Sequence, residues 1–266
     1  MGTEVVQGRV INTNAAFIGR RLTLLGFNVI GAVSLVDDVD IIARHLSYVL
    51  GENPRVVVTT GGLGPTYDDR TLEAVAKAIN RELVPNEEAL AMIKKKYESL
   101  GLPLTNERIK MGYMPRGAKP IPNPVGTAPG CWIELGETII ISLPGVPKEM
   151  EAMWSSWVEP RLREIGPGYH IAEKVLVVRG IPESTMAPVI KSVLRVYPEV
   201  YIKSHPFVDP SGKPLLEIYI MYSHRDDQIA SKVVEDIIKG IRDKYKELYG
   251  TELRIEEIRD QVQTPT

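Results

Sequence analysis

Two adjacent acidic residues, Asp68 and Asp69, directly follow a glycine-rich turn. The turn contains Gly61, Gly62 and Gly64, whose missing side chains would let backbone N–H groups approach an anion. A helix that begins at the aspartates would add positive potential at the same place. Two carboxylates beside an anion-binding turn repel a bare phosphate. The pattern therefore predicts a bound cation, or an aspartate that acts as a base or positions water.

Asp69 also has a simpler interpretation, in which it only caps the helix that follows it. Aspartate is preferred at helix N-termini because its carboxylate accepts a hydrogen bond from a free backbone N–H. The same ambiguity applies to Asp37, which precedes another predicted helix. The neighbouring glycines favour a functional role for Asp69, and capping stays the alternative for both residues.

A strand and a helix position the acidic pair. Arg55–Thr60 is a short β-branched run, which predicts a strand buried on both faces. After the turn, Leu72, Val75 and Ile79 fall on one face of a predicted helix. Ligands of open α/β sheets bind outside the carboxyl ends of the strands, so this junction is a predicted binding site.

A second junction has the same form. Cys131–Leu135 and Thr138–Leu143 are apolar runs joined by a glycine turn, which predicts a β-hairpin. The second run ends at Pro144-Gly145, and a helix start follows. We therefore expect the two strand ends to face one cleft, with Asp37 and Asp69 in its wall.

The rest of the first half alternates in the same way. The predicted elements are a helix capped by Thr13 or Asn14, a strand over Asn28–Val33, a helix ending at Gly51, and helices over Pro85–Leu100 and Thr105–Met111. Alternating strands and helices predict a three-layer α/β/α domain over residues 1–166.

Beyond a linker at Ile165–Gly168 the pattern changes to β-α-β-β-α, which predicts a small two-layer α+β domain over residues 167–250. Residues 251–266 are polar and predict a loose tail. The order of elements is similar to that of KH-like domains. However, this part has no Gly-x-x-Gly loop and no basic-aromatic patch, so we expect no nucleic-acid partner.

Composition excludes further classes of protein. The 266 residues include 32 basic and 34 acidic side chains, so no electrostatic footprint for nucleic acid is present. The single cysteine, Cys131, excludes an internal disulfide and suits a reducing compartment. No apolar run reaches membrane-spanning length and no signal-peptide pattern is present, so we expect a cytoplasmic protein without a membrane partner. The four scattered histidines lack the spacing of zinc ligands.

Three strings in the chain resemble one known family. INTNAAFIGRRL, GGLGPTYDD and SLPGVPKEM are similar to motifs of the N-terminal domain of CinA (competence/damage-inducible) proteins, and more distantly to the molybdopterin-binding domain of MoaB and MogA. The resemblance covers about Gly2 to Trp157 by motif, and it implies the MoaB/MogA-like three-layer fold. Such chains open with a strand that is expected to be internal to the sheet, and that strand is missing before Gly2. The uncovered apolar surface, with Trp154 and Trp157, predicts a homo-oligomer.

The resemblance also implies roles for individual residues. Asp69 and Asp37 would be catalytic, and Asp68 with Asp69 would bind metal. The residues implied to bind substrate are Asn14, Gly61, Gly62, Gly64, Thr66, Gly126, Pro144 and Gly145.

Two functions of different classes follow from the resemblance. The first is a metal-dependent pyrophosphatase that hydrolyses ADP-ribose or a related dinucleotide. It would use Mg²⁺, Mn²⁺ or Co²⁺, and possibly K⁺, as a cofactor. The alternative is a binding module that holds molybdopterin or adenylyl-molybdopterin with little turnover. A decayed site that serves only as a scaffold is a third possibility, against which the intact Asp68, Asp69 and glycines argue.

Overall fold

The computed structural model describes residues 1–209 and 212–259, which form two compact units. The first unit comprises residues 1–20 and 29–164. The second comprises residues 21–28 and the chain from Ile165 onward. Each unit has its own sheet.

The sheet of the first unit has four strands in the order β1-β6-β5-β4. These strands are β1 (Val56–Thr60), β6 (Thr138–Leu143), β5 (Gly130–Leu135) and β4 (Lys119–Ile121). β1 runs parallel to β6, with Thr60 opposite Leu143, while β5 and β4 are antiparallel additions. β5 and β6 form the predicted hairpin, and its turn contains Gly136 with φ of +60°. A separate ribbon pairs β2 (Leu83–Pro85) with β3 (Tyr113–Pro115).

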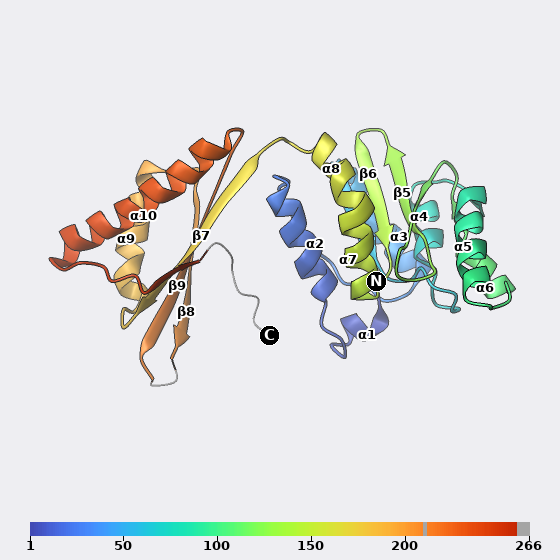
Figure 1. Cartoon of the computed structure of the whole chain (residues 1–266), viewed down its shortest axis with the longest axis horizontal. Coiled ribbons are helices and arrows are strands. Elements are labelled where there is room, and N and C mark those ends of the chain that lie inside the picture. The colour runs from blue at the N-terminus through green and yellow to red at the C-terminus, as the bar shows by residue number, and fades with distance from the viewer. Residues whose placement is uncertain (210–211, 260–266) are drawn as a thin grey trace. The chain divides into compact units, whose positions relative to one another are not determined.

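Helices cover both faces of this sheet, as Figure 1 shows. On one side lie α2 (Thr13–Leu24), α7 (Pro147–Met153), a π-helical turn (Trp154–Val158) and α8 (Glu159–Ile165). On the other side lie α3 (Val39–Gly51), α4 (Thr71–Ala78), α5 (Glu87–Ser99) and α6 (Asn106–Lys110). A further short helix, α1, spans Thr3–Val6. The predicted three-layer α/β/α architecture is confirmed.

Alternation along β5 explains the layers. Cys131 and Ile133 pack with Ile140 against apolar side chains of α3, α4 and α5. Trp132 points to the opposite face, where its ring meets the Trp157 ring edge-on at 5.4 Å. Because successive strand residues face opposite sides, a strand buried on both faces must be apolar throughout.

The strand predicted over Asn28–Val33 is absent, and this prediction was wrong. The segment has no ladder partner among the described residues. Ile30 is 75% exposed and Val33 63% exposed. A strand needs a neighbour for its backbone N–H and C=O groups, and propensity alone does not supply one. The Met1 amino group donates to the Thr60 carbonyl at the end of β1 (2.6 Å), and Gly2 N donates to Leu35 O (3.0 Å), so the N-terminus lies between β1 and the segment that follows Val33.

Two helix starts also differ from the predictions. The helix expected to open at the aspartates begins at Thr71, with Arg70 at the N-cap, so Asp68 and Asp69 lie in the loop before it. The cap of α2 is supplied by Asn12, whose Oδ1 accepts from Ala15 N at 3.0 Å, rather than by Thr13 or Asn14. In both cases a one- or two-residue shift changes the role of a polar side chain.

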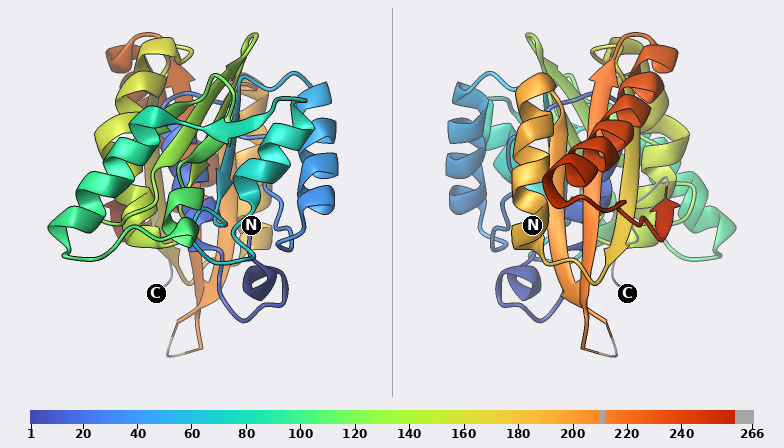
Figure 2. Two further views of the ribbon diagram at one scale, coloured as in Figure 1. Left: turned by 90° about the vertical axis from the view of Figure 1, so that its right-hand side faces the viewer. Right: turned by 90° about the vertical axis from the view of Figure 1, so that its left-hand side faces the viewer.

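The second unit follows the predicted β-α-β-β-α order and adds a strand. Its elements are β7 (His170–Arg179), α9 (Glu183–Val196), β8 (Tyr201–Val208), β9 (Pro214–His224), α10 (Asp227–Tyr249) and β10 (Glu257–Arg259). The antiparallel sheet has the order β10-β7-β9-β8. The right-hand view of Figure 2 shows α9 and α10 across one face of it. Leu176, Ile218 and Ile237 are fully buried between these layers.

Part of the segment expected to be a loose tail belongs to this sheet. β10 pairs with β7, and Leu253 is buried in the core of the second unit. Residues 260–266, also predicted to be loose, lie outside the described residues.

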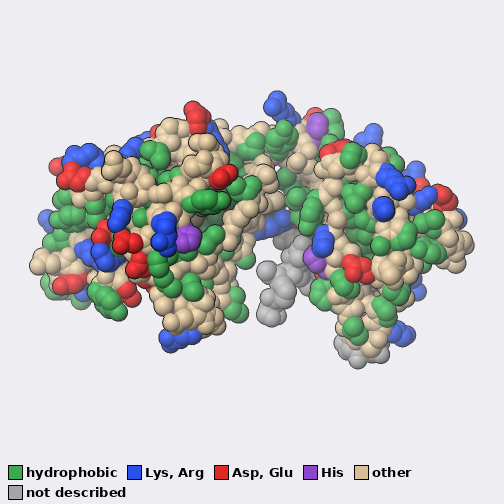
Figure 3. All heavy atoms as spheres, turned by 180° about the vertical axis from the view of Figure 1, so that it is seen from behind, with side chains coloured by type: hydrophobic (Ala, Val, Ile, Leu, Met, Phe, Trp, Pro, Cys, Tyr) green, Lys and Arg blue, Asp and Glu red, His purple; other side chains and the backbone are tan. Residues whose placement is uncertain are grey.

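Surface charge and helix composition agree with the balanced sequence. On the face visible in Figure 3, Lys and Arg side chains are interspersed with Asp and Glu. In the part of the chain that the structure describes, no helix is both long and apolar enough to cross a membrane.

Candidate functional site

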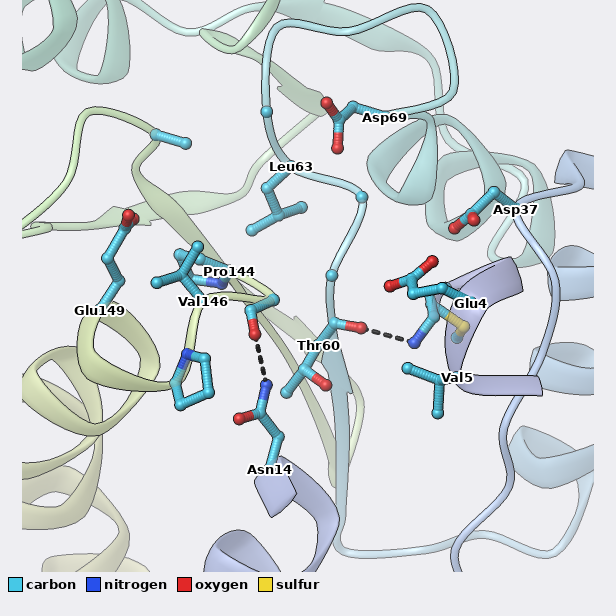
Figure 4. A pocket seen from close by; sticks show the side chains of 18 of the residues that line it. Glu4, Val5, Asn14, Asp37, Thr60, Leu63, Asp69, Pro144, Val146 and Glu149 are labelled. Carbon is cyan, nitrogen blue, oxygen red and sulfur yellow. Dashed lines mark hydrogen bonds between the residues drawn. The ribbon is translucent and has the colours of Figure 1, made fainter. Parts of the chain in front are cut away.

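A cavity of about 570 Å³ lies in the first unit, where β1 and β6 end. Its walls come from the N-terminus, the start of α2, the two strand ends, the loop before α4 and the first turn of α7 (Figure 4). Ten of the predicted site residues line it: Asn14, Asp37, Gly61, Gly62, Gly64, Thr66, Asp68, Asp69, Pro144 and Gly145. Gly126 is not in the lining, although its neighbours Thr127 and Ala128 are. Whether these residues act on a ligand stays a prediction.

The glycines in the wall are required by the packing of the wall itself. Gly61 and Gly62 have φ of +92° and +66°, a left-handed region that favours glycine. A Cβ on Gly62 would lie 2.2 Å from Thr71 Oγ1, and one on Gly61 would lie 2.3 Å from the Met1 carbonyl oxygen. The absence of a side chain at Gly62 therefore lets the loop pack against α4, which is a structural role that the sequence did not separate from ligand contact.

Thr66 holds both aspartates in the loop. Its backbone N–H donates to Asp69 Oδ2 at 2.9 Å, and its hydroxyl lies within hydrogen-bond range of Asp68 Oδ1 (2.6 Å) and Asp69 Oδ2. The hydrogen bond from Thr66 lowers the pKa of Asp68, with a smaller contribution from the Lys110 charge. Asp69 makes no capping bond to α4, so the cap-only interpretation of this residue is wrong.

Lys110 also supports this loop, and sequence reasoning missed it. Its Nζ donates to the Thr66 carbonyl at 2.6 Å, which ties α6 to the residue that holds Asp68 and Asp69. A lysine in a polar helix gives no local signal of such a contact, because 44 residues separate the two partners.

Asp37 lies beside Glu4 in the wall near the N-terminus, as Figure 4 shows, and Asp69 lies on the loop before α4. Asp37 Oδ2 accepts from Thr3 N (2.8 Å) and Thr3 Oγ1 (3.0 Å), so Asp37 stabilises the start of α1. The Met1 amino group interacts electrostatically with the carboxylates of both Asp37 and Glu4. Burial lowers the pKa of the Met1 amino group, while the Asp37 and Glu4 charges act in the opposite direction.

Asn14 has an unused acceptor. Its Nδ2 donates to Gly145 O at 2.9 Å and thereby joins α2 to the end of β6. The side chain is only 7% exposed, and its Oδ1 has no hydrogen-bond partner in the structure. A buried polar atom without a partner in the protein is uncommon, so Asn14 Oδ1 is available to accept a hydrogen bond from water or a ligand.

Glu149 lines the cavity, and sequence reasoning missed it. It lies in the first turn of α7, and its Oε2 accepts from Asn123 Nδ2 at 2.8 Å. A Cβ on Gly126 would lie 1.9 Å from Glu149 Oε2, so Gly126 is needed for the carboxylate to lie where it does. The motif SLPGVPKEM contains this glutamate, but its spacing alone does not show that it faces the cavity.

The cavity is strongly acidic. Its lining includes the carboxylates of Glu4, Asp37, Asp68, Asp69 and Glu149, and among the described residues that line it there is no Lys, Arg or His. An anion entering this cavity would be repelled unless it carried its own cations.

The acidic residues suit a metal that arrives with a phosphate ligand. No group of three or more His, Cys, Asp or Glu side chains that could hold a metal ion gathers anywhere in residues 1–209 or 212–259. Mg²⁺ does not need such a cage, because it is commonly bound by one or two carboxylates together with phosphate oxygens and water. Asp68 and Asp69 provide those two carboxylates at one rim, so they fit this mode of binding.

Comparison with known proteins gives three findings. The sequence model of a family described as "Probable molybdopterin binding domain" matches residues 1–164. Relatives from Pyrobaculum arsenaticum (45% identity over 95% of each chain) and Caldivirga maquilingensis (47% identity over 93% of this chain and 95% of the relative) are both described simply as "Protein". The crystal structure of CinA from Thermoplasma acidophilum, described as a protein of unknown function, has 48% identity and a TM-score of 0.56. The match covers 60% of this chain and 93% of that one.

Proposed function

Because this chain belongs to the molybdopterin-binding domain family and is CinA-like, we propose that its cavity binds a nucleoside diphosphate derivative such as ADP-ribose and hydrolyses the pyrophosphate bond. One observation carries the proposal. A glycine-walled cavity at two strand ends is lined by five carboxylates and by no basic side chain. Such a cavity favours a ligand that is anionic but enters with a divalent cation.

The reaction would consume one water molecule. The water oxygen forms a bond to one phosphorus, the bridging P–O bond breaks, and ADP-ribose gives AMP and ribose 5-phosphate. A divalent ion bound with the substrate would act as a Lewis acid on the phosphate oxygens.

In this proposal Asp69 acts on the attacking water. Thr66 occupies Asp69 Oδ2, and Asp69 Oδ1 has no donor among the described residues. Oδ1 can therefore accept a hydrogen bond from water and orient it or take its proton. Asp68 would share the cation with Asp69, and Asp37 would contribute negative charge from the wall beside Glu4.

The direct test is a substrate panel. Purified protein would be incubated with ADP-ribose, FAD, NAD and adenylyl-molybdopterin, with and without Mg²⁺, Mn²⁺, Co²⁺ and K⁺, and the products separated by ion-exchange chromatography. We expect AMP and ribose 5-phosphate from ADP-ribose in the presence of a divalent ion, and none after chelation. Absence of turnover on every dinucleotide would disprove the proposal.

A second function is favoured by the family description alone. The domain would then bind molybdopterin or its adenylylated form without hydrolysis. In that case the same panel gives no products, and equilibrium dialysis shows retention of the pterin.

A further inference from the structure

The charged side chains that line the cavity are all hydrogen-bond acceptors. Asn14 Oδ1 is buried without a partner, and the carboxylates of the lining add further acceptor oxygens. Among the described lining residues no Lys, Arg or His side chain provides a donor. A ligand that uses these acceptors must bring donors of its own in addition to the cations that its phosphates carry. Sugar hydroxyl groups are donors of this kind.

Glu149 is an acceptor whose position is fixed by hydrogen bonds, and it lies apart from Asp69. Asn123 Nδ2 donates to Glu149 Oε2 (2.8 Å) and to Ala128 O (2.9 Å), while Asn123 Oδ1 accepts from Val125 N and Gly126 N. Both faces of the Asn123 amide are thus used, so the amide cannot turn without losing these bonds. Asn123 fixes the position of the Glu149 carboxylate.

The same carboxylate keeps acceptor capacity for a ligand. Glu149 Oε1 has no donor within the described part of the chain, and Oε2 uses one of its two lone pairs for Asn123. In Figure 4 Glu149 extends from one wall, opposite Glu4 and Asp37 and apart from Asp69. Two acceptor oxygens at a fixed spacing match two neighbouring hydroxyl groups.

We infer that Glu149 is a specificity-determining residue that accepts hydrogen bonds from the vicinal hydroxyl groups of a ribose. The inference rests on the proposed function in that the ligand is a nucleotide, but it does not depend on hydrolysis. A purely structural role, in which Glu149 only holds the Asn123 loop, makes a different prediction about ligands.

The test compares two ligands that differ only in the hydroxyl pair. ADP and 2′,3′-dideoxy-ADP would be titrated, with Mg²⁺, into the full chain by calorimetry, because both carry the same diphosphate and neither carries the second ribose of ADP-ribose. The variants are Glu149→Gln and, as a matched control, Glu137→Gln, an exposed residue in the β5–β6 turn that pairs with Arg55. In Glu149→Gln the amide oxygen stays on Asn123 Nδ2, so an NH₂ donor replaces the acceptor that faces the cavity.

We expect the native chain to bind ADP about 10- to 100-fold more tightly than dideoxy-ADP, the range of hydrogen bonds to a charged group. In Glu149→Gln the preference should disappear through weaker ADP binding, while Glu137→Gln keeps it. An equal loss of affinity for both ligands in Glu149→Gln would show a structural role and overturn the inference. The inference is also overturned if the native protein binds ADP and dideoxy-ADP with equal affinity, or if it does not bind ADP.

A pterin probe separates the remaining alternative. 6-Hydroxymethylpterin has N–H donors but no vicinal hydroxyl pair. If Glu149→Gln lowers the affinity for this pterin more than it lowers the affinity for ADP, the assignment to ribose is wrong. Hydrolysis of ADP-ribose is measured separately, so a chain that discriminates the hydroxyl pair without turnover refutes only the proposed reaction.

Discussion

Asp69 provides the sharpest test of the proposed chemistry at the scale of one residue. Asp69→Asn removes the charge but keeps an oxygen that can accept from Thr66 N, so the loop should persist. We expect kcat for ADP-ribose to fall by about two orders of magnitude or more, as is typical when a preorganised electrostatic group is lost. Steady-state kinetics with the metal ion that gives most activity would measure this.

The matched control for Asp69→Asn is Asp40→Asn. Asp40 is also exposed and carboxylic, but it pairs with Lys77 outside the cavity. Its variant should retain native kinetics. If Asp69→Asn keeps its activity within a few-fold, the reacting water is positioned elsewhere.

Cys131 gives a prediction about pH. Burial raises the pKa of its thiol to about 12, so the folded chain keeps the proton at pH values where the unfolded chain, with a thiol pKa of about 8.5, loses it. The folded state then binds more protons, and stability falls as the pH rises from about 8.5 towards 12. We expect this residue to contribute a loss of about 2 kcal/mol at pH 10 relative to neutral pH.

Two measurements check the Cys131 prediction. A thiol reagent should react with the denatured chain and not with the native chain at pH 8. Urea unfolding at pH 7 and pH 10 should show a smaller pH dependence for Cys131→Ala than for the native chain. Rapid modification of the native thiol would contradict the burial.

Residue types indicated the cavity, but not all of its walls. Asp68, Asp69 and the glycines could be found because they follow one another along the chain. Glu149 and Lys110 could not, because their partners Asn123 and Thr66 lie 26 and 44 residues away. Asn14 was expected near the ligand or as a cap, and the structure assigns the cap to Asn12.

At the scale of elements, the turn between β1 and α4 should not tolerate a side chain at Gly62. In Gly62→Ala the new methyl group would lie 2.2 Å from Thr71 Oγ1 at a positive φ. We expect a loss of about 1–3 kcal/mol in the free energy of unfolding, from overpacking and backbone strain. The variant should therefore lose stability before it loses ligand affinity.

Tryptophan fluorescence can follow this loss in the first unit alone, since all three tryptophans, Trp132, Trp154 and Trp157, belong to it. Gly19→Ala is the control, because a Cβ there meets nothing within 4 Å and α2 gains a better helix former. Its stability should stay equal or rise slightly. Native stability in Gly62→Ala would mean that the loop moves away from α4.

The contact between α6 and the acidic loop gives a further prediction. Lys110→Met keeps most of the aliphatic length but removes the donor to Thr66 O. We expect a lower kcat with a smaller change in KM, because Asp68 and Asp69 lose the support of a fixed Thr66. Lys110→Arg should restore part of the activity, whereas a variant of the exposed Lys94, which pairs with Glu98 on α5, should not change it.

Elements with local signals were predicted and those that depend on distant partners were not. The β5–β6 hairpin and the strand before the glycine turn are fixed by apolar runs and turn residues that lie next to each other. Asn28–Val33 has the same β-branched composition, yet it stays unpaired because no neighbouring strand meets it. Strand formation is a property of a pair of segments, and composition describes only one of them.

At the scale of the whole molecule, the homo-oligomer stays a prediction. The apolar surface that would form its interface differs from the one expected around Trp154 and Trp157. Trp154 is fully buried and Trp157 packs between Trp132 and Arg161, so neither offers a free apolar face. Exposed apolar side chains instead lie in several segments, among them Val10 with Ile11 and Ile30 with Val33. Multi-angle light scattering should give a mass above that of one chain, and Ile30→Lys should lower it. A monomer mass at all concentrations would exclude association.

The parallel pairing of β1 with β6 determines when the cavity forms during folding. Thr59 and Ser142, whose hydroxyl groups meet across these strands at 2.9 Å, are separated by 83 residues. Closing so long a loop is slow compared with forming a helix or the β5–β6 hairpin. The rim that carries Asp69 and the wall that carries Glu149 become neighbours only after that closure. A chain diluted from denaturant should therefore regain its helical circular dichroism well before it can bind a nucleotide. The delay between these two signals measures the time that β1 needs to pair with β6.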